Sequence, residues 1–237
     1  MTLSSEQHPL FSFIIPVFHE STITSFLTQL KTIDDYDRCE VLVVDGSPTK
    51  DTIQKITDPL VRTLYSQPGR GQQMNKGAQQ ALGSILVFLH ADTILPSNAL
   101  ALIEQTLQKK KCCAGAFQLR IDSPRFRYRI LERCISIRGR ITRIPFGDQA
   151  IFMTTIWYQK LGGYQNIPLM EDVELMRRLK QKGGRICILK ETVTTSCRRW
   201  TQEGFVGCTL RNWFIRTLYY LGVHPDKLIK WYRRNHE

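Results

Sequence analysis

The sequence has 237 residues, of which 42% are hydrophobic and 23% charged, a balance typical of a globular domain and not of a disordered chain. Lys and Arg number 33 against 21 Asp and Glu, and the formal net charge of +12 favours anionic partners such as nucleotide phosphates or an anionic membrane surface. No apolar run reaches the roughly 18 residues of a membrane-spanning helix, and the segment Met1 to Pro9 lacks the apolar core of a signal peptide, so we expect a cytoplasmic protein. The cysteines form no CxxC pair, so we expect reduced thiols, without a zinc site or a disulfide framework.

The first half of the chain alternates strand and helix patterns. Apolar runs predict strands at 11–17, 40–44, 61–65 and 85–89. Helical periodicity and turn residues predict helices between and after them, at 23–30, 47–56, 70–82 and 98–109. Repeated strand–helix units of this kind predict an α/β fold with a doubly wound, mostly parallel sheet flanked by helices.

The second half is less regular. It predicts strands at 114–121, 150–153, 185–189 and 192–196, a helix at 170–183 and a helical tail from residue 201. Its most unusual segment carries eight arginines, Arg120, Arg125, Arg127, Arg129, Arg133, Arg138, Arg140 and Arg143. Apolar residues recur in this segment at three- and four-residue steps, which predicts an amphipathic helix with a basic face: Phe126, Ile130, Cys134, Ile137 and Ile141.

Carboxylates follow three of the predicted strands. Glu20, Asp45 and Asp92 come after the first, second and fourth strands, and Arg70 lies in a Gly-flanked loop. Because ligands bind beyond the carboxyl ends of parallel strands, we expect these groups to share one crevice that suits a nucleotide and a divalent cation. Each also has a structural interpretation: Asp92 as a helix cap, Asp45 in a turn and Glu20 in the first turn of a helix.

Two further motifs carry polar side chains with more than one interpretation. Glu171-Asp172 suits a catalytic base, but it also suits the acidic first turn of a helix. Trp200 beside Arg199 suits stacking on a sugar ring, but it also suits packing that fixes the C-terminal helix. The basic segment and the tail suit a surface that meets anionic lipid, or a solvated basic face over an aromatic core stripe. For the tail we favour the aromatic core stripe.

Five motifs in order along the chain resemble family 2 glycosyltransferases of the GT-A fold. They are Ile15–Glu20, Val43–Ser47, His90–Asp92, Glu171-Asp172 and Arg198–Trp200, and the resemblance runs from about Phe11 to Trp200. Two stretches, 69–75 and 89–93, resemble a bacterial subgroup of small soluble transferases. The resemblance implies a single GT-A domain over 1–237, with a nucleotide-binding half at about 10–110, an acceptor half at about 111–200 and a helical C-terminal extension at 201–237.

The same resemblance implies roles for individual residues. Asp172, with Glu171, matches the catalytic base, and Asp92 matches the last carboxylate of the DxD motif, which holds Mg²⁺ or Mn²⁺. His90 stands in place of the first Asp of that motif. The implied nucleotide-binding residues are Pro16, Val17, Glu20, Asp45, Gly46, Ser47, Arg70, Gly71, Asn75, Ala91 and Asp92. The implied contacts to the donor sugar or the acceptor are Asp148, Gln149, Arg199 and Trp200.

We therefore expect an inverting transferase that moves a sugar from a nucleotide-sugar, UDP-linked, to an acceptor hydroxyl. Processive synthesis is not expected, because Thr195 or Ser196 stands where processive relatives carry Gln. The alternatives are a nucleotidyltransferase, or a degenerate transferase scaffold that binds a nucleotide or another anionic ligand without catalysis. The acceptor is unknown, and one hypothesis places it on a lipid or at an anionic membrane surface, with the protein peripheral to the membrane. Nucleic acid is not an expected partner, because the apolar strands look buried on both faces.

Overall fold

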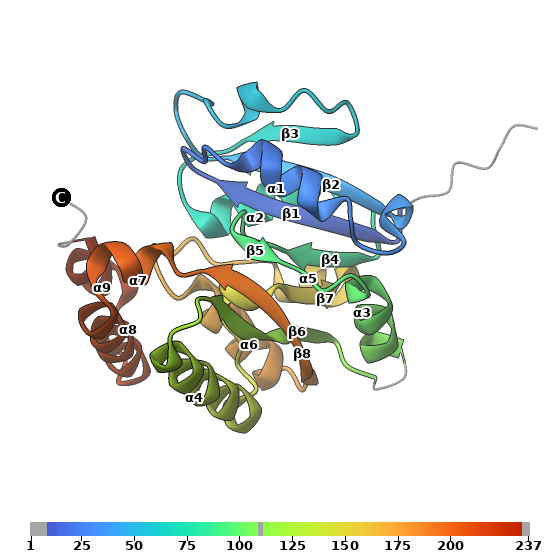
Figure 1. Cartoon of the computed structure of the whole chain (residues 1–237). Coiled ribbons are helices and arrows are strands. Elements are labelled where there is room, and N and C mark those ends of the chain that lie inside the picture. The colour runs from blue at the N-terminus through green and yellow to red at the C-terminus, as the bar shows by residue number, and fades with distance from the viewer. Residues whose placement is uncertain (1–8, 109–110, 234–237) are drawn as a thin grey trace, which may run out of the picture.

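A computed structural model describes residues 9–108 and 111–233. Its centre is an eight-stranded sheet in the order β3-β2-β1-β4-β7-β6-β8-β5 (Figure 1). The strands are β1 (Phe11–Val17), β2 (Cys39–Asp45), β3 (Val61–Tyr65), β4 (Ile85–Phe88), β5 (Thr93–Ile94), β6 (Ala114–Asp122), β7 (Ile151–Thr154) and β8 (Ile186–Ser196). β1 pairs in parallel with β2 and β4, and β2 pairs in parallel with β3, whereas β7 is antiparallel to both of its neighbours. The predicted mostly parallel α/β sheet is confirmed.

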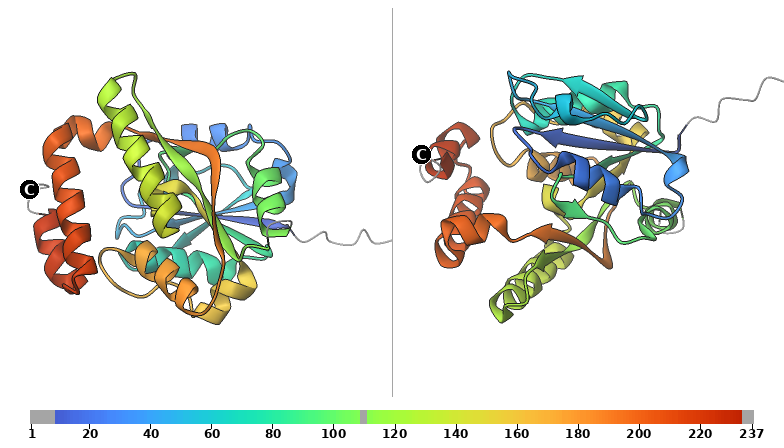
Figure 2. Two further views of the ribbon diagram at one scale, coloured as in Figure 1. Left: turned by 90° about the horizontal axis from the view of Figure 1, so that it is seen from below. Right: turned by 45° about the horizontal axis from the view of Figure 1, so that its top comes forward.

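Helices cover both faces of this sheet. One face packs against α1 (Ile23–Leu30), α3 (Ala99–Gln108) and α4 (Phe126–Thr142), and the other packs against α2 (Arg70–Gln80), α5 (Thr155–Leu161) and α6 (Glu171–Gln181). Short 3₁₀ turns lie at Tyr36–Arg38, Ile53–Lys55 and Gly147–Gln149. The chain ends in α7 (Arg198–Glu203), α8 (Phe205–Tyr220) and α9 (Pro225–Arg233), which lie together at one end of the molecule (Figure 2).

β1 shows how the sequence specifies this layering. Phe11, Phe13 and Ile15 alternate with Ile14 along the strand, and all four side chains are fully buried. The odd-numbered residues join the core beneath α1 and α3, and Ile14 joins the core beneath α2 and α6. Because side chains alternate across a strand, a continuous apolar run fits only a strand that is covered on both faces.

The predicted helix at 47–56 is wrong. This segment is a loop that contains only the 3₁₀ turn Ile53–Lys55. The carboxylate of Asp45 accepts hydrogen bonds from the backbone N–H groups of Ser47 at 2.8 Å, Thr52 at 3.2 Å and Ile53 at 3.3 Å. These donors are bound to the end of β2, so the backbone between them does not form a regular helix.

Smaller differences concern the second half. β8 is one continuous strand where two were expected. α5, which the sequence analysis did not predict, follows β7 directly. The two-residue strand β5 begins at Thr93, and α3 begins only at Ala99. Asp92 therefore does not cap a helix.

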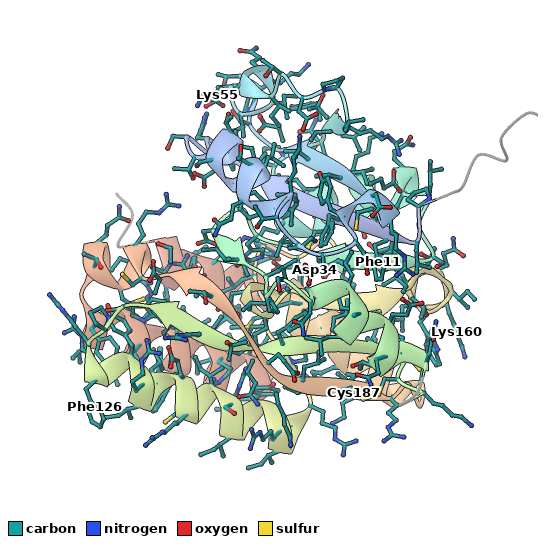
Figure 3. All side chains as sticks on the ribbon, turned by 45° about the vertical axis from the view of Figure 1, so that its right-hand side comes forward. Phe11, Asp34, Lys55, Phe126, Lys160 and Cys187 are labelled. Atoms are coloured by element: carbon teal, nitrogen blue, oxygen red, sulfur yellow. A yellow bond between two sulfur atoms is a disulfide. The ribbon has the colours of Figure 1, made fainter. Side chains whose placement is uncertain are left out.

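The amphipathic helix in the arginine-rich segment is confirmed as α4, but its apolar stripe faces outward. Phe126, Ile130, Ile137 and Ile141 are exposed, and Figure 3 shows Phe126 at the outer edge of the molecule. The opposite side of α4 provides the buried residues Tyr128 and Leu131.

The expected aromatic core stripe of the tail is also wrong, because the aromatic side of these helices faces outward as well. Trp213, Phe214 and Trp231 are exposed, whereas the fully buried residues of α8 and α9 include Cys208, Ile215 and Leu228. Aromatic residues at helical spacing show which side of a helix is apolar, but they do not show whether that side is covered.

The expectation that all thiols stay reduced is wrong for one pair. Cys112 and Cys187 form a disulfide with a Cα–Cα distance of 6.1 Å, although 75 residues separate them in the sequence. β6 and β8 are neighbours, with Gly115 opposite Cys187, and this pairing brings the two cysteines together. No local spacing motif marks such a pair. Among the described residues, no helix has the length and apolar character needed to cross a bilayer.

Candidate active site

A pocket of about 400 Å³ lies beyond the carboxyl end of β4. His90 and Asp92 reach it from the turn that follows β4, and Arg70 reaches it from the first residue of α2. Glu171 and Asp172 reach it from the first turn of α6. Segments that are far apart in the sequence therefore place five titratable side chains around one cavity.

Asp172 is held in a fixed orientation. Its Oδ2 accepts a hydrogen bond from the backbone N–H of Gly147 at 2.5 Å, and its Oδ1 accepts one from the N–H of Val173 at 2.7 Å. An ionised carboxylate has about four acceptor positions, so both oxygens can still accept a proton from a ligand. The N-terminal position on α6 also suits a negative charge.

Burial changes the acidity of this pair. Burial, followed by the negative charge of Asp172, raises the pKa of Glu171 to about 7. Burial also raises the pKa of Asp172, against the opposing effects of the two backbone N–H groups and of Arg70 and Arg138. A carboxylate whose pKa is closer to neutrality is a stronger proton acceptor at physiological pH.

Gly147 brings two of the pocket groups together. A Cβ atom on Gly147 would lie 3.0 Å from Nε2 of His90 and 3.5 Å from Oδ2 of Asp172, so glycine leaves room for both side chains. Burial and the positive charges of Arg70 and Arg199 lower the pKa of His90 to about 3, so its imidazole is neutral. Asp148 is next in the chain, and burial together with the charge of Asp172 raises its pKa to about 6.

Arg70 lines the cationic side of the pocket, and Arg138 lies behind this wall, against Phe146. Burial lowers the pKa of the Arg70 guanidinium, but the negative charge of Glu171 and of the other acidic groups around it outweighs burial and raises the pKa overall. The guanidinium of Arg138 lies 3.6 Å above the ring of Phe146. Burial and the nearby charge of Arg216 lower the pKa of Arg138 to about 10.

Several buried polar atoms near the pocket have no hydrogen-bond partner among the described residues. They include Nε and Nη1 of Arg138, Oδ1 of Asp148, Nε1 of Trp200 and Oγ1 of Thr209. Buried polar groups in proteins are normally paired, and unpaired ones mark places where a ligand or water completes the network.

Within residues 9–108 and 111–233, no group of three or more His, Cys, Asp or Glu side chains can hold a metal ion by itself. Mg²⁺ in phosphate-binding sites is commonly held by one or two carboxylates, with substrate phosphates as further ligands. The exposed carboxylate of Asp92 fits a shared site of this kind. The neutral imidazole of His90 is a poor ligand for Mg²⁺ and, of the two expected ions, is acceptable only to Mn²⁺.

The structure divides the predicted site residues into two groups. The first group lines the pocket, and it contains Arg70, Asp92, Asp148, Glu171, Asp172, Arg199 and Trp200. The second group lies outside its lining, and it contains Pro16, Val17, Glu20, Asp45, Gly46, Ser47, Gly71, Asn75, Ala91 and Gln149. The roles of both groups in binding stay predictions.

Several residues of the second group are bonded within the protein. The oxygens of Asp45 accept the backbone N–H groups of its own loop, as the turn interpretation predicts. Asn75 accepts from the hydroxyl of Tyr158 and from the N–H of Tyr164, and buried Gln149 donates to the carbonyl of Phe117. These side chains shape the strand ends and the wall of the pocket.

The C-terminal helices complete the pocket. Arg198 lies 3.6 Å from Glu20 and so connects α7 to the segment that follows β1. Trp200 packs edge-to-face on Tyr128 of α4 at 6.0 Å and also lines the pocket, so both of its sequence-based interpretations stay open.

Three residues in or beside the site were missed by the sequence analysis, and of these only Arg216 lines the pocket. Arg138 is one of eight arginines in its segment, and Arg216 lies in the basic tail, so no sequence signal separates them from their neighbours. Gln73 donates from its amide to the carbonyls of Val17 and Val44 at 2.7 and 2.8 Å, which joins the ends of β1 and β2.

Comparisons with known proteins agree with this architecture. A mannosyltransferase from Pyrobaculum calidifontis, PcManGT, solved with GDP-Man and Mn²⁺, superposes with a TM-score of 0.67 at 19% identity, over 95% of this chain and 65% of that one. TarS 1–349 of S. aureus, solved with UDP-GlcNAc, superposes with a TM-score of 0.58 at 18% identity, over 78% of this chain and 58% of that one. GalNAc-T7, solved with UDP, GalNAc and Mn²⁺, superposes with a TM-score of 0.61 at 16% identity, over 81% of this chain and 44% of that one.

These structures share the GT-A fold, and the chain spans less than two thirds of the length of each. No curated protein matches the sequence significantly. The profile of glycosyl transferase family 2 matches residues 12–162, which is more than half of the chain and runs from the second residue of β1 to beyond β7. The chain belongs to glycosyl transferase family 2.

Proposed function

We propose that this protein transfers a sugar from a UDP-linked donor to an acceptor hydroxyl, with inversion at the anomeric carbon and with Asp172 as the general base. The observation that carries the proposal is the position of Asp172. This side chain has a raised pKa, is oriented by two backbone N–H groups and lies in one pocket with Arg70 and Asp92.

The chemistry requires such a base. An acceptor hydroxyl is a weak nucleophile until a carboxylate within hydrogen-bond reach takes its proton during attack. A base that activates the acceptor directly gives a single displacement, and a single displacement inverts the sugar carbon, as water attack does in inverting glycosidases. In its ionised form, Glu171 places a second negative charge beside Asp172, and such a charge strengthens Asp172 as a proton acceptor.

The donor occupies the cationic side of the pocket in this proposal. Arg70 binds the diphosphate, since a guanidinium matches phosphate geometry. Asp92, with His90, would hold Mg²⁺ or Mn²⁺, and the cation supplies positive charge to the departing nucleoside diphosphate. UDP-GlcNAc, UDP, GDP-Man and Mn²⁺ in the related structures support the donor class and the cation.

The remaining contacts follow from the arrangement of the pocket. Asp148, Arg199 and Trp200 bind the donor sugar or the acceptor, and residues at the ends of β1 and β2 bind the base and ribose. The basic helix α4 forms part of the wall through Leu131 and Ile135, which supports an acceptor presented at an anionic membrane surface.

The substitution Asp172→Asn tests the proposal. It preserves the shape of the side chain and removes the base, so we expect UDP release from a responsive UDP-sugar to fall by about 10²- to 10⁴-fold. Calorimetric titration with UDP should show unchanged affinity. Asp122→Asn, at an exposed carboxylate at the end of β6, is the matched control and should leave both measurements unchanged.

Two results would contradict the proposal. Full turnover by the Asp172→Asn variant would exclude Asp172 as the base. Tight UDP binding by the wild-type protein, without turnover of any UDP- or GDP-sugar, would favour a non-catalytic scaffold.

A further inference from the structure

The outer side of α4 carries an apolar stripe that no described residue covers. Phe126, Ile130, Ile137 and Ile141 are between 51% and 76% exposed, and Cys134 is exposed between them. Their spacing of i, i+4, i+8, i+11 and i+15 places them on one side of the helix. In both views of Figure 2, α4 projects from the body of the molecule. The exposed fractions show that this side of the helix faces outward.

Arginines lie along this stripe. Arg120, Arg129, Arg133 and Arg140 line a shallow groove beside α4, and Ile137 of the stripe lines the same groove. Its one acidic residue, Glu132, is 3.0 Å from Arg129 and neutralises one of the four cations. The groove therefore carries excess positive charge directly beside exposed aliphatic side chains.

A second apolar stripe lies on α8, at the same end of the molecule. Val206, Leu210 and Phe214 are exposed at four-residue spacing, and Phe214 stacks on Trp231 of α9 with a centroid distance of 5.4 Å. In Figures 1 and 2, α8 and α4 both lie on the side of the sheet away from β3. α4 and α8 thus both expose apolar side chains at this end of the molecule, and the basic groove lies beside α4.

The charge of this surface shows which of three possible partners it suits: a second copy of the chain, a nucleic acid or a lipid bilayer. In a two-fold dimer through α4, the arginines of one copy would meet the arginines of the other, because such an interface pairs the same patch on both subunits. A nucleic acid would contact the arginines but would leave the aliphatic stripe without a complementary surface. An anionic bilayer matches both features, with phosphates for the guanidinium groups and an acyl region for the apolar side chains.

We propose that the outer side of α4 is a docking surface for an anionic lipid bilayer. Phe126, Ile130, Ile137 and Ile141 enter the boundary between headgroups and acyl chains, while Arg133 and Arg140 bind lipid phosphates. Leu131 and Ile135, on the opposite side of the same helix, line the pocket. Docking through α4 therefore holds the pocket within about one helix diameter, roughly 10–12 Å, of the membrane.

Cosedimentation of the full chain with vesicles tests this surface without any sugar substrate. We expect binding to phosphatidylcholine vesicles that contain phosphatidylglycerol at low salt, and little binding to phosphatidylcholine alone. The double variant Ile137→Asp/Ile141→Asp should lose at least tenfold in vesicle affinity, because it places charge in the apolar stripe. Leu82→Asp/Ile156→Asp, at two exposed positions outside α4, should bind like the wild-type protein.

A second pair of variants tests the charge. Arg133→Ala/Arg140→Ala should weaken binding severalfold and reduce its dependence on salt, whereas Arg185→Ala/Lys190→Ala should not. Circular dichroism and urea denaturation of each variant show that it is folded, and so separate loss of the surface from unfolding.

Three outcomes would overturn the proposal. The first is a wild-type protein that does not bind the phosphatidylglycerol vesicles, and the second is equal binding by the Ile137→Asp/Ile141→Asp variant. The third is a stable dimer in solution that the same variant dissociates, because the stripe would then belong to a second copy. None of these outcomes depends on whether the pocket transfers sugar.

Discussion

Substrate was expected to contact two regions: the ends of β1 and β2, and the pocket beyond β4. The two regions differ in whether their buried polar groups find hydrogen-bond partners within the protein. Asp45, at the end of β2, is fully buried, and its carboxylate accepts three backbone hydrogen bonds. In the pocket, Oδ1 of Asp148 and Nε1 of Trp200 are buried without a partner among the described residues, and so are two nitrogens of Arg138 behind the pocket wall.

We infer from this difference that the pocket groups are left to a ligand, whereas Asp45 maintains the shape of the strand end at which we propose that the base and ribose bind. A polar group that the protein itself pairs maintains local shape, and replacing it reduces stability. An unpaired buried group, or a titratable group with a displaced pKa, is tolerated where a ligand makes use of it. The following substitutions test that division.

Asp45→Ala should have the largest effect on stability. It leaves the N–H groups of Ser47, Thr52 and Ile53 without their acceptor, so we expect a loss of about 3 kcal/mol in the free energy of unfolding. Urea denaturation followed by circular dichroism measures this loss. The control Asp122→Ala, at an exposed position, should change stability by less than about 0.5 kcal/mol. An equal, small effect of both variants would contradict the structural role of Asp45.

Arg70→Ala should affect binding more than stability. Loss of a charged hydrogen-bond donor to the diphosphate predicts UDP affinity about 10- to 100-fold weaker. The midpoint of urea denaturation should stay close to that of the wild-type protein. Arg185→Ala removes an exposed arginine outside the pocket and should leave UDP affinity unchanged. Unaltered UDP binding by Arg70→Ala would place the diphosphate elsewhere.

Glu171→Gln should produce the smallest effect, a shift in the pH profile. The base acts in its deprotonated form, so turnover falls as the pH decreases through the raised pKa of Asp172. Removing the negative charge of Glu171 lowers that pKa and should move the acid limb of kcat/KM to lower pH, by up to about one unit. Glu191→Gln, at an exposed position on β8, should leave the profile unchanged. A shift to higher pH would contradict the coupling.

Much of the fold could be predicted because its signals are local. The apolar runs at 11–17 and 85–89 and the periodic segment at 23–30 each contain enough residues to specify an element. The loop after β2 could not be predicted, because Ser47 and Pro48 suit the start of a helix and the side chain of Asp45 overrides that preference. The Cys112–Cys187 disulfide depends on the pairing of β6 with β8, which no local pattern encodes.

In the site, too, local motifs could be predicted from the sequence, whereas contacts between distant segments could not. Motif order was sufficient to select Arg70, Asp92 and Asp172, which the structure brings to one pocket. The partner atoms of Asp172 come from Gly147 and Val173, and the role of Gly147 depends on a distant turn reaching α6. For α4, the periodicity identified the apolar side correctly, but only the packing of Tyr128 and Leu131 shows that this side faces outward.

Calorimetric titration of UDP in the presence of Mn²⁺ is the most direct test of a nucleotide-sugar site in this pocket. We predict binding by the wild-type protein that is abolished by a chelator, strongly weakened in Asp92→Asn and retained in Asp172→Asn. The account would be contradicted if neither UDP nor GDP binds, or if the Asp92→Asn variant binds UDP as tightly as the wild-type protein and keeps its dependence on Mn²⁺.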